Sequence, residues 1–419
     1  MKKKTIYDVV IVGGGAAGIT AAVFAAEKKA RVLILEHMET IGKKILATGN
    51  GKCNYTNRKQ GVSHYRGEDP AFVLPVMEQF GFEETVAFFG ELGIYPKEKN
   101  GYFYPASEQA SSVLLVLKMR LRQLGVEIEC GVGIRSIRQE KNGFVFETKT
   151  GDYYGKSCIL ATGGYAAKKT GSDGSGFIYA KNFGHHLSEP VPALVQLVAE
   201  KPFEKEMAGV RTIADVRIFA DGKLLHHDVG ELQLTDYGIS GIPVFQVSRF
   251  AAKALKMGQK VTTELDLFPS MEKDELFLLL KKRFFDNGKG KTAAEALIGL
   301  FPEKLGAVLL KRSAIEAKRD TSGISEKELF ALCKQIKQFR LNIEKTNKFD
   351  AAQVTAGGIL TKELDSLTLE SKFVKGLFFA GEIIDIDGEC GGYNLQWAWS
   401  SGAVAGSAAA DYARKGMVK

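Results

Sequence analysis

The chain has 419 residues, of which 45% are hydrophobic and 25% charged, the proportions of a globular protein with a sizeable core and two or three domains. Five scattered cysteines without a C-x-x-C pair exclude a disulfide framework and a redox dithiol, and six histidines without paired ligand spacing predict no metal site. The net charge of +8 is compatible with a polyanionic partner such as RNA, with acidic small molecules, or with solubility alone.

The first residues resemble a signal peptide or a membrane span, because Lys2, Lys3 and Lys4 precede an uncharged stretch from Val9 to Ala26. Consecutive glycines make that stretch a poor apolar segment, and nothing else in the chain is long enough to span. We therefore expect no targeting sequence, no transmembrane helix and a reducing, cytoplasmic location.

Residues 7–12 form an apolar run that predicts a strand, and residues 31–35 form a second one. Between them, Gly13, Gly15 and Gly18 give the spacing G-x-G-x-x-G, and small residues continue as a helix to about residue 29. The first glycine permits a tight turn, the second lets backbone approach a pyrophosphate, and the third lets the helix pack on the sheet. Glu36 closes the second strand, where a carboxylate binds ribose hydroxyls. An ordinary glycine-rich turn does not explain this acid, which favours FAD or NAD over NADP.

The next informative stretch, residues 42–57, is rich in glycine, lysine and amides. It is either a long polar loop or, as we expect from its place after Glu36, a segment that lies along a bound dinucleotide. Residues 70–125 read as mostly helical. Within them, residues 102–105 form an aromatic cluster that either packs in the core or lines a cleft for a planar substrate.

From residue 126 the pattern turns to strands, at 126–130, 134–139, 143–149 and 157–161, and the last strand runs into Thr162, Gly163 and Gly164. Such a strand end is a place where backbone comes close to a ligand. Residues 171–176 are also glycine-rich, but no strand directly precedes them. We therefore reject them as a second dinucleotide fingerprint, and we find no separate βαβ unit for NAD(P)H elsewhere.

The middle of the chain changes character. Residues 191–268 read as β-rich, and residues 270–318 switch to helical periodicity with many lysines. The fold class we predict is α/β: a glutathione-reductase-like Rossmann FAD domain, discontinuous in sequence, with an inserted β-rich domain and a small helical domain. The expected bounds are 1–190 and 351–419 for the FAD domain, 191–268 and 322–350 for the β-rich domain, and 269–321 for the helical domain.

Near the carboxyl terminus a buried-type strand at residues 376–380 runs into Gly381, Glu382 and Asp385. Gly391 and Gly392 then open a helix of small residues that extends to about residue 410. The acids are suited to a ribityl chain, and the helix amino end to negative charge at the N1/O2 side of a reduced flavin. This second site favours FAD, which spans both ends of the chain, over NAD.

Several motifs together carry a family resemblance: GGGAAG, TGNGKCNYTN, ILATGG with TGSDGSG, GELQLTDYGISG, QVTAGG and FAGEIIDIDGECGGYNLQWAWSSG. The chain resembles, over nearly its whole length, the BaiN/RdsA-type family of NAD(P)/FAD-dependent oxidoreductases, also labelled aminoacetone-oxidase-like. The resemblance implies an FAD domain, a β-rich second domain and a small helical third. It also implies two activities, reduction of C=C bonds in 3-oxo bile acid intermediates and reduction of a ribosomal RNA uridine to dihydrouridine.

On these motifs we expect FAD to be bound by the fingerprint, by the polar loop after it, by the strand end at 161–164 and by the carboxyl-terminal loop. The expected cofactor-binding residues are Gly13, Gly15, Ala16, Ala17, Gly18, Glu36, His37, Lys44, Thr48, Gly49, Lys52, Cys53, Asn54, Val132, Ala161, Thr162, Gly163, Gly164, Gly381, Glu382, Asp385, Gly391, Gly392, Tyr393, Asn394 and Leu395.

Both implied substrates carry an electron-poor C=C conjugated to a carbonyl, so one mechanism serves both: hydride transfer from flavin N5, a donor to the carbonyl oxygen, and an acid for the α-carbon. Cys53 or Cys390 could supply that proton, or could merely fill space beside the ring. Tyr393 is either a donor or a structural neighbour of the flavin. Arg211 could reach the site from the second domain.

The high pI and the lysine-rich helical insert favour uridine in 23S ribosomal RNA as the substrate, with a steroid-like 3-oxo bile acid as the alternative. NAD(P)H is the expected electron donor. Two readings of another class stay open: a flavin amine oxidase that uses O₂, and a flavin-bearing RNA-binding protein.

Overall fold

The protein is described here from a computed structural model that defines residues 5–201 and 203–415. The chain divides into two compact units, one made of Met1–Pro190 with Gln353–Lys419, and the other of Val191–Ala352. Each unit has its own hydrophobic core. The first unit is therefore built from both ends of the chain.

The first unit is organised around a seven-stranded sheet in the order β7-β2-β1-β10-β9-β8, with β19 also pairing β10. Strands β1 (Ile6–Val12), β2 (Val32–Leu35), β7 (Glu127–Glu129), β10 (Asp152–Leu160) and β19 (Leu377–Phe379) run parallel. Strands β9 (Gly143–Thr148) and β8 (Ile134–Glu140) continue as an antiparallel meander. The expected strands are confirmed. The apolar runs of β1, β2, β19 and the second half of β10 are buried, whereas β7 and β8 at the sheet edges are mostly exposed.

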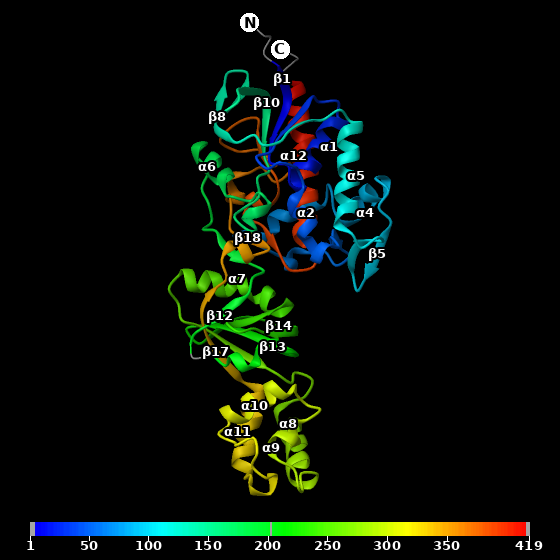
Figure 1. Ribbon diagram of the computed structural model, residues 1–419. Coiled ribbons are helices and arrows are strands. Elements are labelled where there is room, and N and C mark those ends of the chain that lie inside the picture. The colour runs from blue at the N-terminus through cyan, green and yellow to red at the C-terminus, as the bar shows by residue number, and fades with distance from the viewer. Residues whose placement is uncertain (1–4, 202, 416–419) are drawn as a thin grey trace. The chain divides into compact units, whose positions relative to one another are not determined.

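Two helices made largely of small residues, α1 (Ala16–Glu27) and α12 (Tyr393–Lys415), pack against each other beside this sheet (Figure 1). A Cβ atom added at Gly402 would lie 2.5 Å from the Ala17 carbonyl oxygen, and one at Gly406 would overlap the Ala21 carbonyl. The contact is therefore backbone against backbone. It joins the first helix of the chain to the last.

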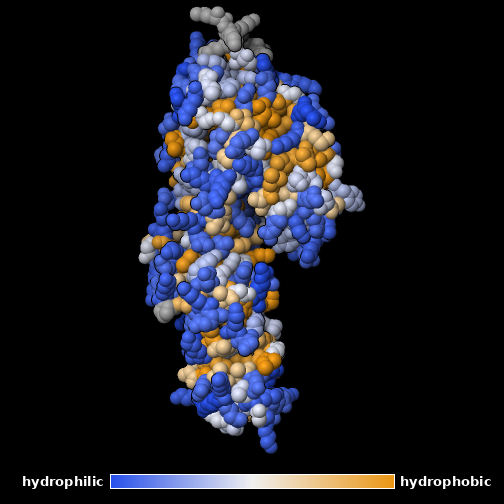
Figure 2. Space-filling view, in the orientation of Figure 1, coloured by the Kyte–Doolittle hydropathy of each residue, from blue (hydrophilic) through white to orange (hydrophobic). Residues whose placement is uncertain are grey.

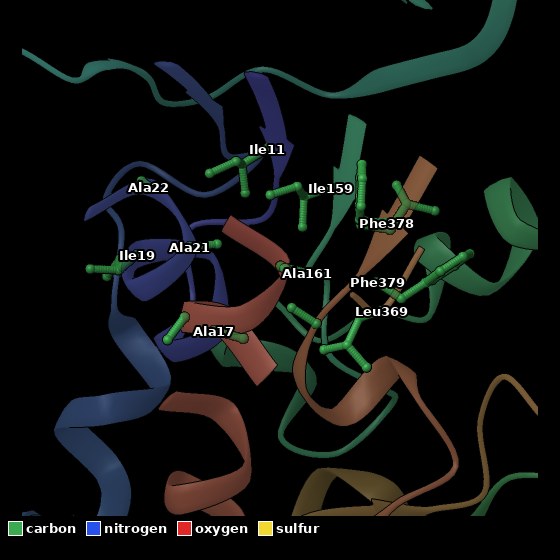
Figure 3. Close-up of a cluster of buried hydrophobic side chains, with 14 of the residues drawn as sticks. Ile11, Ala17, Ile19, Ala21, Ala22, Ile159, Ala161, Leu369, Phe378 and Phe379 are labelled. Atoms are coloured by element: carbon green, nitrogen blue, oxygen red, sulfur yellow. The ribbon is translucent and has the colours of Figure 1, made fainter. Parts of the chain in front are cut away.

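The core beneath these helices is mostly apolar. Ile11 of β1, Ile159 of β10 and Phe378 of β19 are no more than 1% exposed, and they meet in the cluster drawn in Figure 3. At roughly 25 cal/mol for each Å² of apolar surface, each such side chain contributes about 2 kcal/mol. This rigid sheet holds the ends of β1 and β10 close together.

Smaller elements cover the other parts of the first unit. These are α2 (Lys43–Ala47), α3 (Val73–Met77), α4 (Phe82–Glu91), α5 (Ala110–Gln123), α6 (Ser175–Asn182), a sheet of β3 (Thr56–Asn57), β6 (Tyr102–Pro105) and β5 (Pro96–Lys99), and the pair β4 (Tyr65–Arg66) and β20 (Asp387–Gly388). Helix α6 follows a 3-10 turn at Lys168–Thr170, so no strand leads directly into it.

The second unit contains a closed antiparallel barrel in the order β12-β15-β14-β13-β16-β17. Its strands are β12 (Leu197–Ala199), β13 (Arg211–Ala220), β14 (Lys223–Leu234), β15 (Gly238–Gly241), β16 (Val261–Asp266) and β17 (Phe339–Thr346). Helix α7 (Ile242–Lys256) packs on the barrel and on β11 (Val191–Ala193).

Between β16 and β17 the chain forms the helices α8 (Lys273–Lys281), α9 (Ala293–Leu297), α10 (Glu303–Arg312) and α11 (Glu326–Lys337). Helical structure thus continues past residue 321, where the sequence predicted a return to β-structure. The reason is local: Leu329, Leu332 and Ile336 form one apolar face, and Ser325 and Glu328 make a capping box at its start. The helices share one hydrophobic core with the barrel.

Among the described residues, no helix combines the length and apolarity needed to cross a membrane. Within the same ranges, no three His, Cys, Asp or Glu side chains gather as a possible metal site.

Candidate cofactor site

The three fingerprint glycines differ in what surrounds them. Gly13 has a φ of +103°, and an added Cβ there would lie 2.6 Å from the Ala161 carbonyl oxygen. A Cβ at Gly18 would overlap the carbonyl oxygen of Gly13. A Cβ at Gly15 would meet nothing within 4 Å. The first and third glycines are therefore demanded by the turn, whereas the second leaves open space at the amino end of α1.

That amino end is prepared for an anion. No side chain caps α1, and its first turn holds no acidic residue. The first N–H groups of a helix lack intrahelical partners and stand at the positive end of the helix dipole. The open space above Gly15 lets a phosphate approach these groups.

Glu36 is held rigidly beside this turn. Its Oε2 accepts a hydrogen bond from Gly14 N at 2.7 Å, its Oε1 accepts one from Met38 N at 2.8 Å, and the residue is only 7% exposed. The Nδ1 atom of His37 lies 3.3 Å from Oε1. The Val132 N–H donates to the Glu36 carbonyl oxygen at 2.9 Å, which aligns the residue-132 segment with the end of β2.

The loop after β10 is tied to the carboxyl-terminal part of the same unit. Gly163 has a φ of +71°, and an added Cβ at Gly164 would lie 2.6 Å from the Cβ of Thr355. The Thr355 hydroxyl accepts hydrogen bonds from the N–H groups of Tyr165 and Ala166. Thr162, between β10 and Gly163, is half-buried.

Three further contacts join the first and last thirds of the chain. Lys44 Nζ lies 2.8 Å from Oε2 of Glu382, whose Oε1 accepts from Thr355 N at 3.0 Å. Gly381, with a φ of +79°, faces helix α1, because an added Cβ would lie 2.8 Å from the Ala17 Cβ. Asp385, a little further on, is fully buried, and its Oδ2 accepts from Glu68 N at 3.0 Å.

The segment Thr48–Asn54 is an irregular turn. Gly49, Asn50 and Cys53 all have positive φ, and Gly49 to Lys52 are exposed. Cys53 is fully buried behind them, and burial raises the pKa of its thiol to about 12, against a smaller lowering by its hydrogen bond with Thr48. The thiol is therefore neutral at physiological pH.

The start of α12 closes on that turn. Gly391 and Gly392 have φ values of +139° and +95°, and the Asn57 Nδ2 donates to the Gly391 carbonyl at 3.0 Å. An added Cβ at Gly392 would lie 3.0 Å from Asn54 Oδ1, an atom that is buried without a hydrogen-bond partner. The two segments that the sequence predicted to meet at a flavin ring are thus in contact.

The residues that follow brace the loop. The Asn394 side chain accepts from Gly388 N and donates to the Gly388 carbonyl, each at 2.8 Å, and Leu395 is half-buried beside it. Cys390 is half-buried on the same loop. The first turn of α12 contains no acidic residue, so its amino end also suits a negative charge.

Tyr393 is 4% exposed, and burial raises the pKa of its phenol. Its ring stacks on His64, with centroids 4.5 Å apart. His64 Nδ1 lies 2.8 Å from Glu389 Oε2, and Arg66 pairs with the other oxygen at 2.6 Å. Sequence reasoning missed His64, Arg66 and Glu389, because no spacing links residues 64–66 to a loop more than 300 positions later.

Of the four candidate catalytic residues, Cys53, Cys390 and Tyr393 lie on the two segments that converge near Gly392. Arg211 belongs to the other unit, on β13, where its Nη1 lies 2.8 Å from Glu231 Oε1 on β14 and its side chain is 61% exposed.

These surroundings fit FAD. The space at Gly15 and the uncapped α1 suit a pyrophosphate, Glu36 suits a ribose, and the buried, unpartnered Asn54 Oδ1 suits the N3–H of the flavin pyrimidine. The start of α12, whose first turn contains no acidic residue, suits the N1/O2 edge of the same ring. Together these groups match the successive parts of one dinucleotide, from the ribose and pyrophosphate to the flavin ring.

The comparisons with known proteins agree with this site. A family model described as the HI0933-like protein Rossmann domain matches residues 7–408. A 3-dehydro-bile acid delta(4,6)-reductase from Clostridium scindens is 47% identical over 96% of this chain and 98% of its own length. A ribosomal RNA dihydrouridine synthase from Haemophilus influenzae is 28% identical over 94% and 96%.

Among solved structures, the open conformation of a flavocytochrome c3 fumarate reductase is similar, with a TM-score of 0.51 over 98% of this chain and 79% of that one. At 17% identity this likeness concerns the fold alone.

Proposed function

Because the chain belongs to the HI0933-like protein Rossmann domain family and is an oxidoreductase of the FAD type, we propose that it reduces a carbon–carbon double bond conjugated to a carbonyl group. The observation that carries this proposal is the Clostridium scindens relative, 47% identical from end to end, whose name describes reduction of such a bond. NAD(P)H is the proposed source of the electrons.

The chemistry that FAD supplies when bound and reduced is a hydride for the β-carbon of the double bond. The electron pair of that bond then moves toward the carbonyl oxygen, and a proton must be added at the α-carbon, so that two hydrogens are gained in all. The chain's own residues have two tasks: to stabilise the negative oxygen and to deliver the proton.

We assign the proton delivery to Cys390 rather than Cys53. Cys390 is half-buried on the loop that precedes α12, where a ligand can reach it. Cys53 is sealed from solvent, and its raised pKa, caused by burial, makes its thiol a poor acid. Cys53 fits the other alternative, a small side chain that packs beside the ring.

The first substrate class we propose is a 3-oxo steroid of the bile-acid type with a double bond conjugated to the 3-oxo group. Support comes from the identity of 47% over almost the full length, compared with 28% for the ribosomal RNA synthase. Both substrate classes present the same reacting atoms, so the choice between them concerns the surroundings of the double bond.

Ribosomal RNA uridine is the second candidate, and a specific observation favours it. Residues 281–345 hold fifteen basic and eight acidic residues, a net charge of +7, whereas the whole chain carries +8. Hydrophilic side chains cover much of the visible face of this helical segment (Figure 2). Within residues 281–345, Lys282, Lys289 and Lys318 are exposed, as phosphate contacts require.

The experiment uses the purified flavoprotein without oxygen, with NADH or NADPH as reductant. The acceptors are a 3-oxo-4-ene steroid and 23S ribosomal RNA from a strain that lacks dihydrouridine, and mass spectrometry identifies a product heavier by two hydrogens. We expect the steroid to be reduced, and reduction of the RNA alone would make uridine the substrate. Consumption of NAD(P)H or an amine only when O₂ is admitted, with neither acceptor reduced, would point to an oxidase instead.

A further inference from the structure

We propose that Tyr104 is a catalytic residue whose hydroxyl donates a hydrogen bond to the carbonyl oxygen of the substrate. This inference rests on the proposed reduction of a conjugated C=C, and it assigns the task of stabilising the negative oxygen, which the residues discussed so far leave open.

The position of Tyr104 follows from strand β6. Successive side chains of a strand point to opposite faces, and here Phe103 is 4% exposed while Tyr102 and Tyr104 on the other face are half-buried. Phe103 packs edge-on against Phe82, with centroids 5.0 Å apart. The hairpin is therefore anchored by Phe103, which leaves the two phenols on a separate face.

Both phenols face the loops that form the ring end of the cofactor site. The Cε1 atom of Tyr104 would lie 3.7 Å from a Cβ added at Gly49, and that of Tyr102 would lie 3.0 Å from one added at Gly391. Glycine at residue 391 gives the Tyr102 ring room, and Tyr104 lies at van der Waals distance from the position of a Cβ at residue 49. Strand β6 thus runs between the turn that holds Cys53 and the loop that holds Cys390.

The hydroxyl of Tyr104 has no hydrogen-bond partner among residues 5–201 and 203–415. Two other tyrosines of the unit do have one: Tyr65 donates to Gln60 Oε1 at 3.1 Å, and Tyr179 to the Ile134 carbonyl at 2.7 Å. The buried hydroxyl of Tyr55, like that of Tyr104, has none within the same ranges. A partly buried phenol normally finds such a partner. The free donor of Tyr104 is therefore available to a ligand.

The neighbouring charges leave this donor in its neutral form. Burial, the nearby Tyr102 and Cys390, and the carboxylate of Glu108 all raise the pKa of the Tyr104 phenol. The Glu108 carboxylate forms ion pairs with Lys52 Nζ at 3.2 Å and with Lys97 Nζ at 2.8 Å. A neutral hydroxyl fixed on a strand is a preorganised donor for an oxygen on which negative charge develops.

The test compares Tyr104→Phe with Tyr95→Phe, which removes a hydroxyl from the same hairpin at a residue that is 79% exposed. Two quantities are measured: the anaerobic rate of reduction of a 3-oxo-4-ene steroid, and the infrared C=O stretching frequency of that steroid bound to the oxidised flavoprotein, which needs no turnover. We expect Tyr104→Phe to lower the rate about a hundredfold, as removal of one oxyanion donor does, and to raise the C=O frequency. Tyr95→Phe should change neither.

The flavin content and thermal midpoint of both variants verify that they fold, since Phe keeps the ring that packs at Gly49. If the wild-type protein reduces the steroid and Tyr104→Phe matches it in rate and C=O frequency, the assignment of Tyr104 is overturned and the proposed function stands. If the wild-type protein reduces neither the steroid nor ribosomal RNA, the proposed function fails and the assignment fails with it.

Discussion

The two ends of the candidate cofactor site are built in different ways. At the fingerprint end, backbone atoms set the limits: Gly13 and Gly18 are glycine because a Cβ would meet the carbonyl oxygens of Ala161 and Gly13. At the ring end, the site depends on side chains. Asn54 lies against Gly392 and Tyr393 stacks on His64, and each of these pairs joins residues that are far apart in the sequence. The first kind of site is fixed by a local motif, and the second only by the complete fold.

The largest effect is expected at the third fingerprint glycine. Gly18→Ala places a Cβ on the Gly13 carbonyl oxygen, and neither backbone segment can move without distorting the turn. We expect the first unit to lose about 3 kcal/mol of unfolding free energy and to be purified without FAD. Chemical denaturation and flavin absorbance measure both.

The matched control is Gly15→Ala, because its Cβ meets nothing within 4 Å and its φ of −81° suits alanine. This substitution should lower the free energy of unfolding by less than about 1 kcal/mol. FAD should bind about tenfold more weakly, since the methyl group stands where a phosphate must approach. Equal loss of stability in both variants would contradict the distinction between the two glycines.

A smaller effect, confined to turnover, is expected at the ring end. Cys390→Ala removes the proposed proton donor and should lower kcat for steroid reduction about a hundredfold, with the FAD content unchanged. Cys53→Ala should instead lower stability by about 1 kcal/mol and leave kcat within a few fold. The opposite pattern would exchange the roles of the two thiols.

Next in size is the change at Asn54. Its Oδ1 is buried without a hydrogen-bond partner, which destabilises the ligand-free protein by about 1–3 kcal/mol. A ligand that donates a hydrogen bond to this oxygen offsets that loss. Asn54→Leu should therefore leave the ligand-free protein equally or more stable, while FAD binds about tenfold more weakly in fluorescence titrations. Loss of stability with unchanged FAD affinity would mean that this oxygen does not face the cofactor.

The smallest effect concerns the sheet below the fingerprint. Burial raises the pKa of Glu127, but hydrogen bonds from Tyr7 at 2.7 Å and Arg31 at 2.8 Å outweigh burial, so the folded-state pKa is lowered below 4.5. The stabilisation is therefore present above pH 4.5 and is lost as the pH falls through the folded-state value.

Thermal midpoints of the wild type and of Glu127→Gln, measured from pH 7 down to pH 3, test this sign. The variant should melt a few degrees lower at pH 7, and the difference should vanish toward pH 3. A difference that grows on acidification would contradict the lowered pKa.

The sequence could predict the parts of this structure that obey local rules. The strand, glycine turn, helix and closing acid of residues 7–36 follow from spacing and burial, and so does the small-residue helix at the other end of the chain. Spacing also indicated that the two ends belong to one domain, because both suit the same dinucleotide.

The remainder depends on contacts that no local pattern encodes. The pairing of Lys44 with Glu382 and the stacking of His64 on Tyr393 each join residues more than 300 positions apart. The aromatic cluster at residues 102–105 allowed core packing or a cleft; the strand buries Phe103 and Pro105 and leaves Tyr102 and Tyr104 half-buried on its other face. Helix α11 lies where the sequence predicted β-structure, and its capping box and apolar stripe are the local signals that favour the helix.

The most direct test of the whole account is a single turnover without oxygen. The bound FAD is first reduced with dithionite, and the protein is then mixed in a stopped-flow instrument with a 3-oxo-4-ene steroid while flavin absorbance is recorded. The account predicts rapid reoxidation of the flavin, with one equivalent of steroid gaining two hydrogens. A flavin that stays reduced with the steroid and with ribosomal RNA, and reoxidises only when O₂ is added, would contradict it.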